Sequence, residues 1–227
     1  MVVNDLIERL RSSQFITKVI PTLESELQNE LKNCRTILDL GCGPKSPIRE
    51  ITWASNRVGV EAFEPYALTA ELSNTHDEII RSMIQDLEFA ENSFDAVTLI
   101  DVIEHMPKEV GMQVIELAQK WASKKVIISS PNGFIKQEAL DGNDLQKHLS
   151  GWPLAEMKTL GYRTRGMAGL KLLRREVQEE TMGDDLLVTI RFKPRFFWFL
   201  VSTISQPYVY RRPGLAFSLF SVFEVSK

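Results

Sequence analysis

The sequence predicts an α/β fold in which helices cover both faces of a mostly parallel sheet. Two observations lead to this prediction. Short apolar runs alternate with helical stretches along the chain, and some runs, such as Val126 to Ile128, contain no polar residue. Strands that alternate with helices pair in parallel, and strands without polar alternation are buried on both sides. The length of 227 residues and the hydrophobic content of 44% are typical of one large globular domain.

The individual elements follow in a regular order. Leucines at positions 23, 27 and 31 repeat at helical spacing, so residues 1–33 are expected to be helical. Strands are expected over residues 36–40, 57–61, 78–84, 94–100, 125–130 and 161–167. Helices are expected over 45–54, 65–74 and 107–122, and another follows Pro153. Ligands of such sheets bind beyond the carboxyl ends of the strands, so the residues just after each strand are the functional candidates.

Composition and charge exclude several classes of protein. The net charge of −3 argues against a general nucleic-acid binder. The two cysteines, Cys34 and Cys42, imply no disulfide scaffold and fit a reducing compartment such as the cytoplasm. The first ten residues have no apolar stretch, so no signal peptide is expected. The longest apolar run, residues 196–204, is about half the length that spans a bilayer.

A glycine turn follows the first predicted strand. Residues 39–44 read D-L-G-C-G-P, and Gly41 and Gly43 allow a sharp turn with room for a ligand, although an ordinary strand-to-helix turn is the alternative. Glu61 lies 18 residues beyond Gly43, at the end of the second strand, where a carboxylate can accept hydrogen bonds from both ribose hydroxyls. Ser46 stands where a dinucleotide fingerprint has its third glycine, and no phosphate-loop lysine is present. The pattern therefore favours a nucleotide-type ligand other than NAD or ATP.

In these residues the sequence resembles the class I S-adenosylmethionine-dependent methyltransferases. Five stretches carry the resemblance in the family's order, over residues 37–44, 59–65, 86–97, 101–105 and 130–132. The resemblance implies a three-layer Rossmann-like methyltransferase fold whose mostly parallel seven-stranded sheet ends in an antiparallel strand, expected over 215–225. It also implies one methyltransferase domain over 1–227, with an N-terminal helical segment (1–33), a cofactor-binding core (34–168), an insertion (169–213) and a final strand (214–227).

The resemblance further implies that S-adenosylmethionine is the cofactor and assigns residues to its parts. The methionine portion would lie against Asp39, Gly41, Cys42 and Gly43, the ribose against Glu61 and Ala62, the adenine against Asp86 and Leu87, and the methionine amino group against Asp101 and Val102. Nothing in the sequence activates the Cys42 thiol, so we interpret it as a small filler of the turn rather than a nucleophile.

Three residues are candidates for acid–base chemistry. Methyl transfer from a sulfonium is an in-line displacement that depends mainly on positioning, and a general base is needed only where the acceptor loses a proton. Glu104 and His105 follow the fourth strand, and His148 lies in a polar loop after the fifth. Alternatively, Glu104 and His105 only orient the loop. Some relatives hold a divalent metal with a comparable set, which here would be Asp101, Glu104, His105 and His148. Asp101 replaces the glutamate of those relatives, so no metal is assigned.

The end of the chain differs from the rest in charge. Residues 161–227 contain 11 basic and 6 acidic side chains, and nine of the 20 aromatic residues lie between Phe196 and Phe223. The segment 192–212 is interpreted in three ways: a helix packed on the sheet, a wall over an apolar substrate, or a membrane-surface contact through Lys193, Arg195, Arg211 and Arg212.

The predicted function is methyl transfer to a small-molecule or lipid-like acceptor, and peripheral membrane contact through residues 192–212 stays one of the three interpretations of that segment. Nucleic acid is not expected as a partner, because no single-stranded nucleic-acid module is evident. Two alternatives remain: a non-catalytic cofactor-binding protein of the same fold, and an NAD-dependent oxidoreductase.

Overall fold

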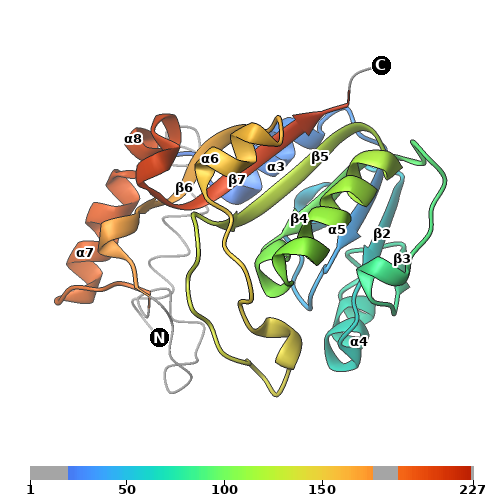
Figure 1. Ribbon diagram of the computed structural model, residues 1–227, viewed down its shortest axis with the longest axis horizontal. Coiled ribbons are helices and arrows are strands. Elements are labelled where there is room, and N and C mark those ends of the chain that lie inside the picture. Colours follow the sequence, from blue (N-terminus) through green and yellow to red (C-terminus); the bar gives the residue numbers. More distant parts are fainter. Residues whose placement is uncertain (1–19, 176–188, 226–227) are drawn as a thin grey trace.

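The strands of the described residues form a single mixed sheet (Figure 1). The computed structural model describes residues 20–175 and 189–225. Within them, seven strands are arranged in the order β3-β2-β1-β4-β5-β7-β6. The strands are β1 (Thr36–Leu40), β2 (Asn56–Val60), β3 (Glu78–Ile80), β4 (Phe94–Ile100), β5 (Ala122–Pro131), β6 (Arg163–Leu170) and β7 (Ala216–Glu224). Strands β1 to β5 pair in parallel, and β7 runs antiparallel between β5 and β6, so the predicted sheet is confirmed.

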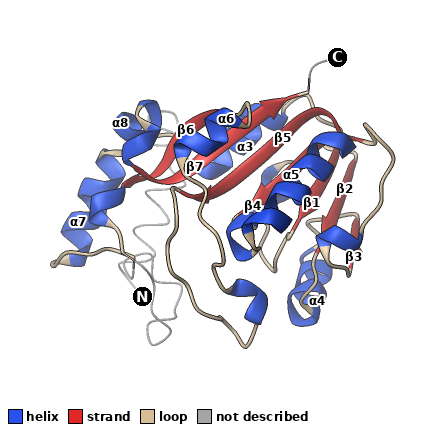
Figure 2. Cartoon of the chain, in the orientation of Figure 1, coloured by secondary structure: helices blue, strands red, loops and turns tan. Residues whose placement is uncertain are grey.

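Helices cover both faces of this sheet (Figure 2). Because neighbouring side chains of a strand point to opposite faces, Ile37 of β1 packs with α3 (Leu23–Leu31), and Leu38 packs with the cluster beneath α5 (Lys108–Trp121) and α6 (Leu154–Thr159). The three layers thus come from strands that are apolar on both sides. The expected helices over 107–122 and after Pro153 correspond to α5 and α6.

Helix α3 is fixed over the sheet at both ends. At its N-terminus, Thr22 and Ser25 form a capping box, in which each side chain accepts a hydrogen bond from the other's backbone N–H. Near its C-terminus, Glu30 lies 2.6 Å from both Lys125 Nζ and Arg163 Nη2. Burial alone would raise the pKa of Glu30, but the hydrogen bonds from these two cations outweigh it and lower the pKa. These contacts hold Leu23 at the edge of the sheet where the cavities described below open.

Two of the predicted elements differ from the structure. The helix expected over 45–54 is wrong: only a 3-10 turn, Pro47–Glu50, forms there. The Ser46 hydroxyl caps this turn through the N–H of Ile48, and a single tight turn already buries both Ile48 and Ile51. The strand expected over 78–84 ends at Ile80, and a 3-10 turn follows at Ile84–Asp86. Helix α4 (Glu64–Ser73) agrees with the helix expected over 65–74.

The chain beyond β6 packs two helices, α7 (Arg195–Ile204) and α8 (Gln206–Arg211), at the far end of the sheet (Figure 1). The Gln206 side chain accepts a hydrogen bond from Gly169 N at 2.9 Å and donates one to Gly166 O at 3.0 Å. A Cβ at Gly166 would lie 2.2 Å from the carbonyl oxygen of Val209, so only glycine allows α8 to approach β6 this closely. The described ranges contain no helix both long and apolar enough to cross a bilayer. The predicted division into segments stays a prediction, since parts of it lie outside the described residues.

Candidate active site

A cavity of about 500 Å³ opens at the carboxyl ends of β1, β2 and β4. This is the edge of an open α/β sheet where ligands bind. Every loop that follows one of these strands contributes to its wall. Of the predicted site residues, the cavity is lined by Gly41, Cys42, Gly43, Glu61, Ala62, Asp101, Val102 and His105.

The glycine turn has a conformation that demands glycine. Gly41 and Gly43 have φ angles of 65° and 58°, in the left-handed region. A Cβ at Gly41 would lie 2.7 Å from Cγ2 of Val102, whereas a Cβ at Gly43 would meet no atom within 4 Å. The buried Val102 side chain therefore packs directly against the backbone of the turn.

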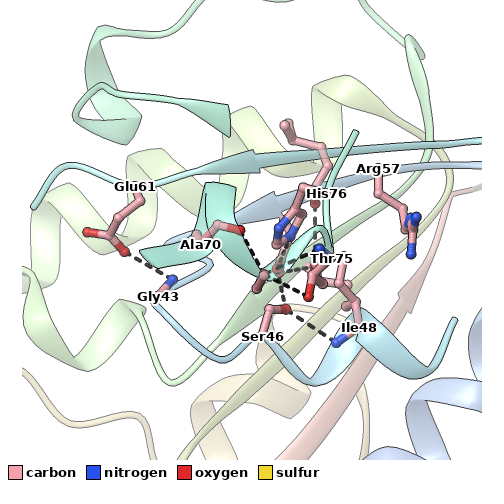
Figure 3. Close-up of polar contacts among 12 residues, drawn as sticks. Gly43, Ser46, Ile48, Arg57, Glu61, Ala70, Thr75 and His76 are labelled. Atoms are coloured by element: carbon pink, nitrogen blue, oxygen red, sulfur yellow. Dashed lines mark hydrogen bonds and ion pairs between the residues drawn. The ribbon is translucent and has the colours of Figure 1, made fainter. Parts of the chain in front are cut away.

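Glu61 connects the end of β2 to this turn. Its Oε2 accepts a hydrogen bond from Gly43 N at 3.0 Å (Figure 3). Its Oε1 accepts one from Phe63 N at 2.8 Å. Burial raises the pKa of Glu61. The hydrogen bonds that backbone N–H groups donate to its carboxylate oppose this shift. A carboxylate can accept about four hydrogen bonds. Each Glu61 oxygen accepts one from the backbone, so each can accept a further one from a ligand hydroxyl. The carboxylate is thus positioned by the backbone and open to the cavity.

Asp39 supports the turn from behind and does not line the cavity. Its Oδ2 accepts a hydrogen bond from Ser46 Oγ at 2.6 Å and lies 3.0 Å from Nε2 of His76, and its Oδ1 accepts one from Thr98 Oγ1 at 2.6 Å. Figure 3 shows Ser46 and His76 converging beneath the turn. The Asp39 carboxylate is buried, and these partners compensate for its lost hydration. A direct contact between Asp39 and the methionine portion of a cofactor remains a prediction.

The network behind the turn includes a histidine to which the sequence analysis gave no role. The side chain of His76 is 1% exposed. The signal that could have found it is Asp39 itself, because a carboxylate in a buried strand needs hydrogen-bond donors.

The predicted adenine residues lie beside the cavity rather than in its wall. Asp86 is exposed and Leu87 packs on the core, while Met83, Ile84 and Gln85 line the cavity just before them. The roles of Asp86 and Leu87 therefore stay predictions.

Cys42 lines the cavity without being reactive. It is 6% exposed, and burial, followed by the negative charge of Asp39, raises the pKa of its thiol well above the usual value. A protonated thiol is a poor nucleophile, which fits a small residue that fills the turn.

Asp101 follows β4 in an unusual backbone conformation. Its φ is 55°, and its Oδ1 accepts a hydrogen bond from Ser129 Oγ at 3.2 Å. The side chain is solvent-accessible and lines two cavities, this one and a second described below. The surrounding chain still removes part of its hydration, and this desolvation raises the pKa of the Asp101 carboxyl.

Glu104, His105 and His148 lie together, each offering one ligand atom within 4.8 Å of the others. Nδ1 of His105 lies 3.2 Å from Lys147 O, and Nδ1 of His148 lies 2.6 Å from Ile135 O. A carbonyl oxygen only accepts, so each Nδ1 carries hydrogen, and a neutral ring keeps its lone pair on Nε2. Glu104 Oε2 is buried and has no hydrogen-bond partner. Asp101, which the sequence suggested as a fourth metal ligand, does not belong to this group.

Burial is the largest cause of the pKa shifts of Glu104 and His105. Burial raises the pKa of Glu104 well above its usual value, and the nearby Asp101 adds to the shift. Burial and the neighbouring His148 lower the pKa of His105 to about 4. Of the three candidate acid–base residues only His105 lines the cavity; Glu104 and His148 lie behind it.

Comparison with known proteins agrees with this geometry. The sequence model of a family described as "Methyltransferase domain" matches residues 38–122. The chain is 34% identical over 91 residues to sterol 24-C-methyltransferase ERG6A of Gibberella zeae. The matched region covers 36% of this chain and 24% of that protein. The chain thus spans about a quarter of the length of this curated relative.

Solved structures share the whole fold of the chain. The PH0226 protein of Pyrococcus horikoshii OT3 has a TM-score of 0.53 and 19% identity, over 95% of this chain and 93% of that one. The plantazolicin methyltransferase BpumL in complex with SAH has a TM-score of 0.52 and 14% identity, over 90% and 81%. A SAM-dependent methyltransferase from Archaeoglobus fulgidus has a TM-score of 0.52 and 14% identity, over 89% and 92%. These similarities show the class I, Rossmann-like methyltransferase fold and confirm the predicted fold class.

Proposed function

We propose that this protein is an S-adenosylmethionine-dependent methyltransferase that acts on a small-molecule or lipid-like acceptor. One observation carries the proposal: the Glu61 carboxylate, held by the N–H of Gly43, faces a cavity of about 500 Å³ beside the glycine turn. A carboxylate at the end of β2 suits the two hydroxyls of a ribose. The methyltransferase-domain match over residues 38–122 supports the same cofactor.

The cofactor would supply an electrophilic methyl group, and the chain's residues would bind and orient it. Gly41 and Gly43 would leave space for the methionine portion, and Asp101 would accept a hydrogen bond from its amino group. Glu61, with Ala62 beside it, would bind the ribose. Asp86 and Leu87 would approach the adenine from the turn after β3. A reducing cytoplasm is the proposed location, in keeping with the two free cysteines.

Titration with S-adenosylhomocysteine in a calorimeter tests the cofactor. We expect saturable binding of one molecule per chain and no heat from NAD. No heat at high micromolar S-adenosylhomocysteine contradicts the proposal, and binding of NAD instead favours the oxidoreductase. Release of S-adenosylhomocysteine from S-adenosylmethionine, measured over a panel of alcohols and amines, separates the enzyme from a non-catalytic binding protein.

A second candidate function is cation binding by Glu104, His105 and His148. The observation that favours it is the arrangement of the two imidazoles. Metal-bound histidines usually donate their second N–H to a carbonyl or carboxylate, and here Nδ1 of both rings faces a backbone carbonyl oxygen. The unpartnered Glu104 Oε2 completes a set of two histidines and one carboxylate, which suits Zn²⁺, Mn²⁺ or Fe²⁺.

The cation is tested by equilibrium dialysis against Zn²⁺ or Mn²⁺. We expect one ion per chain in the wild type and a loss of affinity of roughly 100-fold in His148→Ala. Glu109→Gln is the matched control, because this exposed carboxylate on α5 lies outside the cluster. If the wild type binds no ion and a chelator leaves methyl transfer unchanged, the cluster only orients the loop.

We also propose that residues 192–212 contact an anionic membrane surface. Phe197 and Ile204 on α7 and Tyr208 on α8 are 53%, 74% and 51% exposed, and the spacing of seven places Phe197 and Ile204 on one side of α7. Lys193 and Arg211, both exposed, lie close to these side chains in the sequence. Exposed apolar side chains with cations beside them are typical of helices that bind the bilayer interface.

Co-sedimentation with vesicles tests this contact. We expect binding to vesicles with phosphatidylglycerol, weaker binding to pure phosphatidylcholine, and a large loss of binding in the double variant Phe197→Ser and Tyr208→Ser. Leu72→Ser is the matched control, since Leu72 on α4 is 82% exposed and lies outside this segment. Equal loss in both variants, or no binding by the wild type, rejects the contact.

A further inference from the structure

A second cavity, of about 450 Å³, lies next to the first. Its walls come from the N-terminal end of α3, the end of β6 and one side of α7. Its apolar lining includes Ile20, Leu23, Met167, Phe199, Leu200 and Ile204, and polar or charged residues, among them Glu24, Arg174 and Gln206, also line it. None of the residues assigned to the cofactor lines this cavity except Asp101.

The backbone at the end of β6 creates this space. The pairing of β6 with β7 shifts between Met167 and Leu170, and the intervening Ala168 and Gly169 have φ angles of 61° and 75°. A Cβ at Gly169 would lie 2.3 Å from Ser202 Oγ, so the irregularity brings α7 directly against the strand end. The left-handed conformation costs free energy at Ala168, and the result is a hollow between β6, β7 and α7 rather than a continuous ladder.

The two cavities meet at the end of the sheet. Asp101 and Leu23 line both of them. Asp101 is joined to Ser129, which lines the second cavity, by the hydrogen bond of 3.2 Å from Ser129 Oγ. One pair of polar side chains in the second cavity, Asp101 and Ser129, therefore lies where this cavity meets the cofactor cavity. Such a volume, with apolar walls and a few converging polar groups, is typical of a site for a small organic molecule.

We propose that the second cavity is the acceptor site, and that it takes an apolar molecule whose one hydroxyl or amine group meets Asp101 and Ser129. The proposal rests on the proposed methyltransferase function. In the transfer, the bond between the methyl carbon and the sulfonium sulfur breaks, and its electron pair stays on sulfur. The acceptor oxygen or nitrogen forms the new bond to the methyl carbon. Its proton passes to the Asp101 carboxylate and from there to water.

This assignment explains why Asp101 is open to both cavities. A carboxylate at the junction can hold the acceptor's donor group in line with the methyl group, and positioning of this kind is the main contribution of the protein to such a displacement. The apolar side chains of the wall, among them Met167, Phe199 and Leu200, would contact the apolar body of the acceptor.

The experiment uses N-phenyl-1-naphthylamine, an apolar molecule with one N–H group whose fluorescence rises in apolar surroundings. The probe is titrated into the full chain, with and without saturating S-adenosylhomocysteine. Leu200→Trp fills the second cavity from α7 and leaves the first untouched. Phe197→Trp is the matched control, since it adds the same indole to the exposed side of the same helix.

We expect saturable binding of the probe to the wild type, no displacement by S-adenosylhomocysteine, and a loss of affinity of at least roughly tenfold in Leu200→Trp alone. The affinity of Leu200→Trp for S-adenosylhomocysteine should equal that of the wild type, which shows that the variant is folded. Displacement of the probe by S-adenosylhomocysteine, or equal probe affinity in both variants, overturns the proposal. Because the probe is measured without the cofactor product, a failure of cofactor binding is seen separately.

Discussion

Replacing Glu61 by glutamine is expected to weaken the binding of S-adenosylhomocysteine by at least about 100-fold. A hydrogen bond to a charged group contributes about 1.5–3 kcal/mol, and the substitution affects those to both ribose hydroxyls. The amide also presents an N–H₂ group where Glu61 now accepts from Gly43 N and Phe63 N, so one of these donors loses its partner. Isothermal titration calorimetry measures the change directly.

The matched control for this prediction is Glu64→Gln. Glu64 lies three residues further on, is exposed and pairs with Arg81, so the variant removes the same charge from the neighbourhood without touching the cavity. We expect its affinity for S-adenosylhomocysteine to match that of the wild type. A similar loss in both variants would mean that the general negative charge, rather than the Glu61 carboxylate, governs binding.

The succession of strands along the chain and the edge of the sheet that carries the cofactor cavity could be predicted from the sequence, because both depend on local patterns. The apolar run of β1 ends at Gly41 whatever lies elsewhere in the chain, and the carboxyl ends of parallel strands meet at one edge. The antiparallel β7 came from the family resemblance instead. Its apolar alternation is too imperfect to specify a direction.

Long-range partners could not be predicted in the same way. His76 lies 37 positions from Asp39 in the sequence and meets it only because β2 and β3 pair beside β1. The Nδ1 partners of His105 and His148 are backbone carbonyl oxygens, which leave no mark in a sequence. The helix expected over 45–54 did not form, since the tight turn capped by Ser46 already buries Ile48 and Ile51.

The second cavity could not be predicted from the sequence either. It depends on the left-handed backbone at Ala168, and alanine gives no signal for that conformation. The aromatic content of residues 196–199 did indicate an unusual helix, but only the structure separates the inward Phe199 from the exposed Phe197.

The other large effect is expected from Gly41→Ala, which should lower both the thermal stability and the affinity for S-adenosylhomocysteine. An alanine in the left-handed region costs about 1–2 kcal/mol. Its Cβ would also lie 2.7 Å from Cγ2 of Val102, and overpacking of this kind costs about 1–3 kcal/mol more. For a chain of 227 residues this sum corresponds to a fall in Tm on the order of 10 °C, measured by differential scanning calorimetry.

Two further variants separate the contributions of backbone and contact. Gly43 also has a left-handed φ, but a Cβ added there would meet no atom within 4 Å. The free energy of unfolding of Gly43→Ala should therefore fall only by the cost of the left-handed backbone. Val102→Ala combined with Gly41→Ala removes the overlapping methyl groups, and a double-mutant cycle should give a favourable coupling of about 1–3 kcal/mol. If the two substitutions are merely additive, Val102 does not set the shape of the turn. A favourable coupling in both stability and affinity would show that the loop after β4 holds the glycine turn in the conformation that receives the ligand.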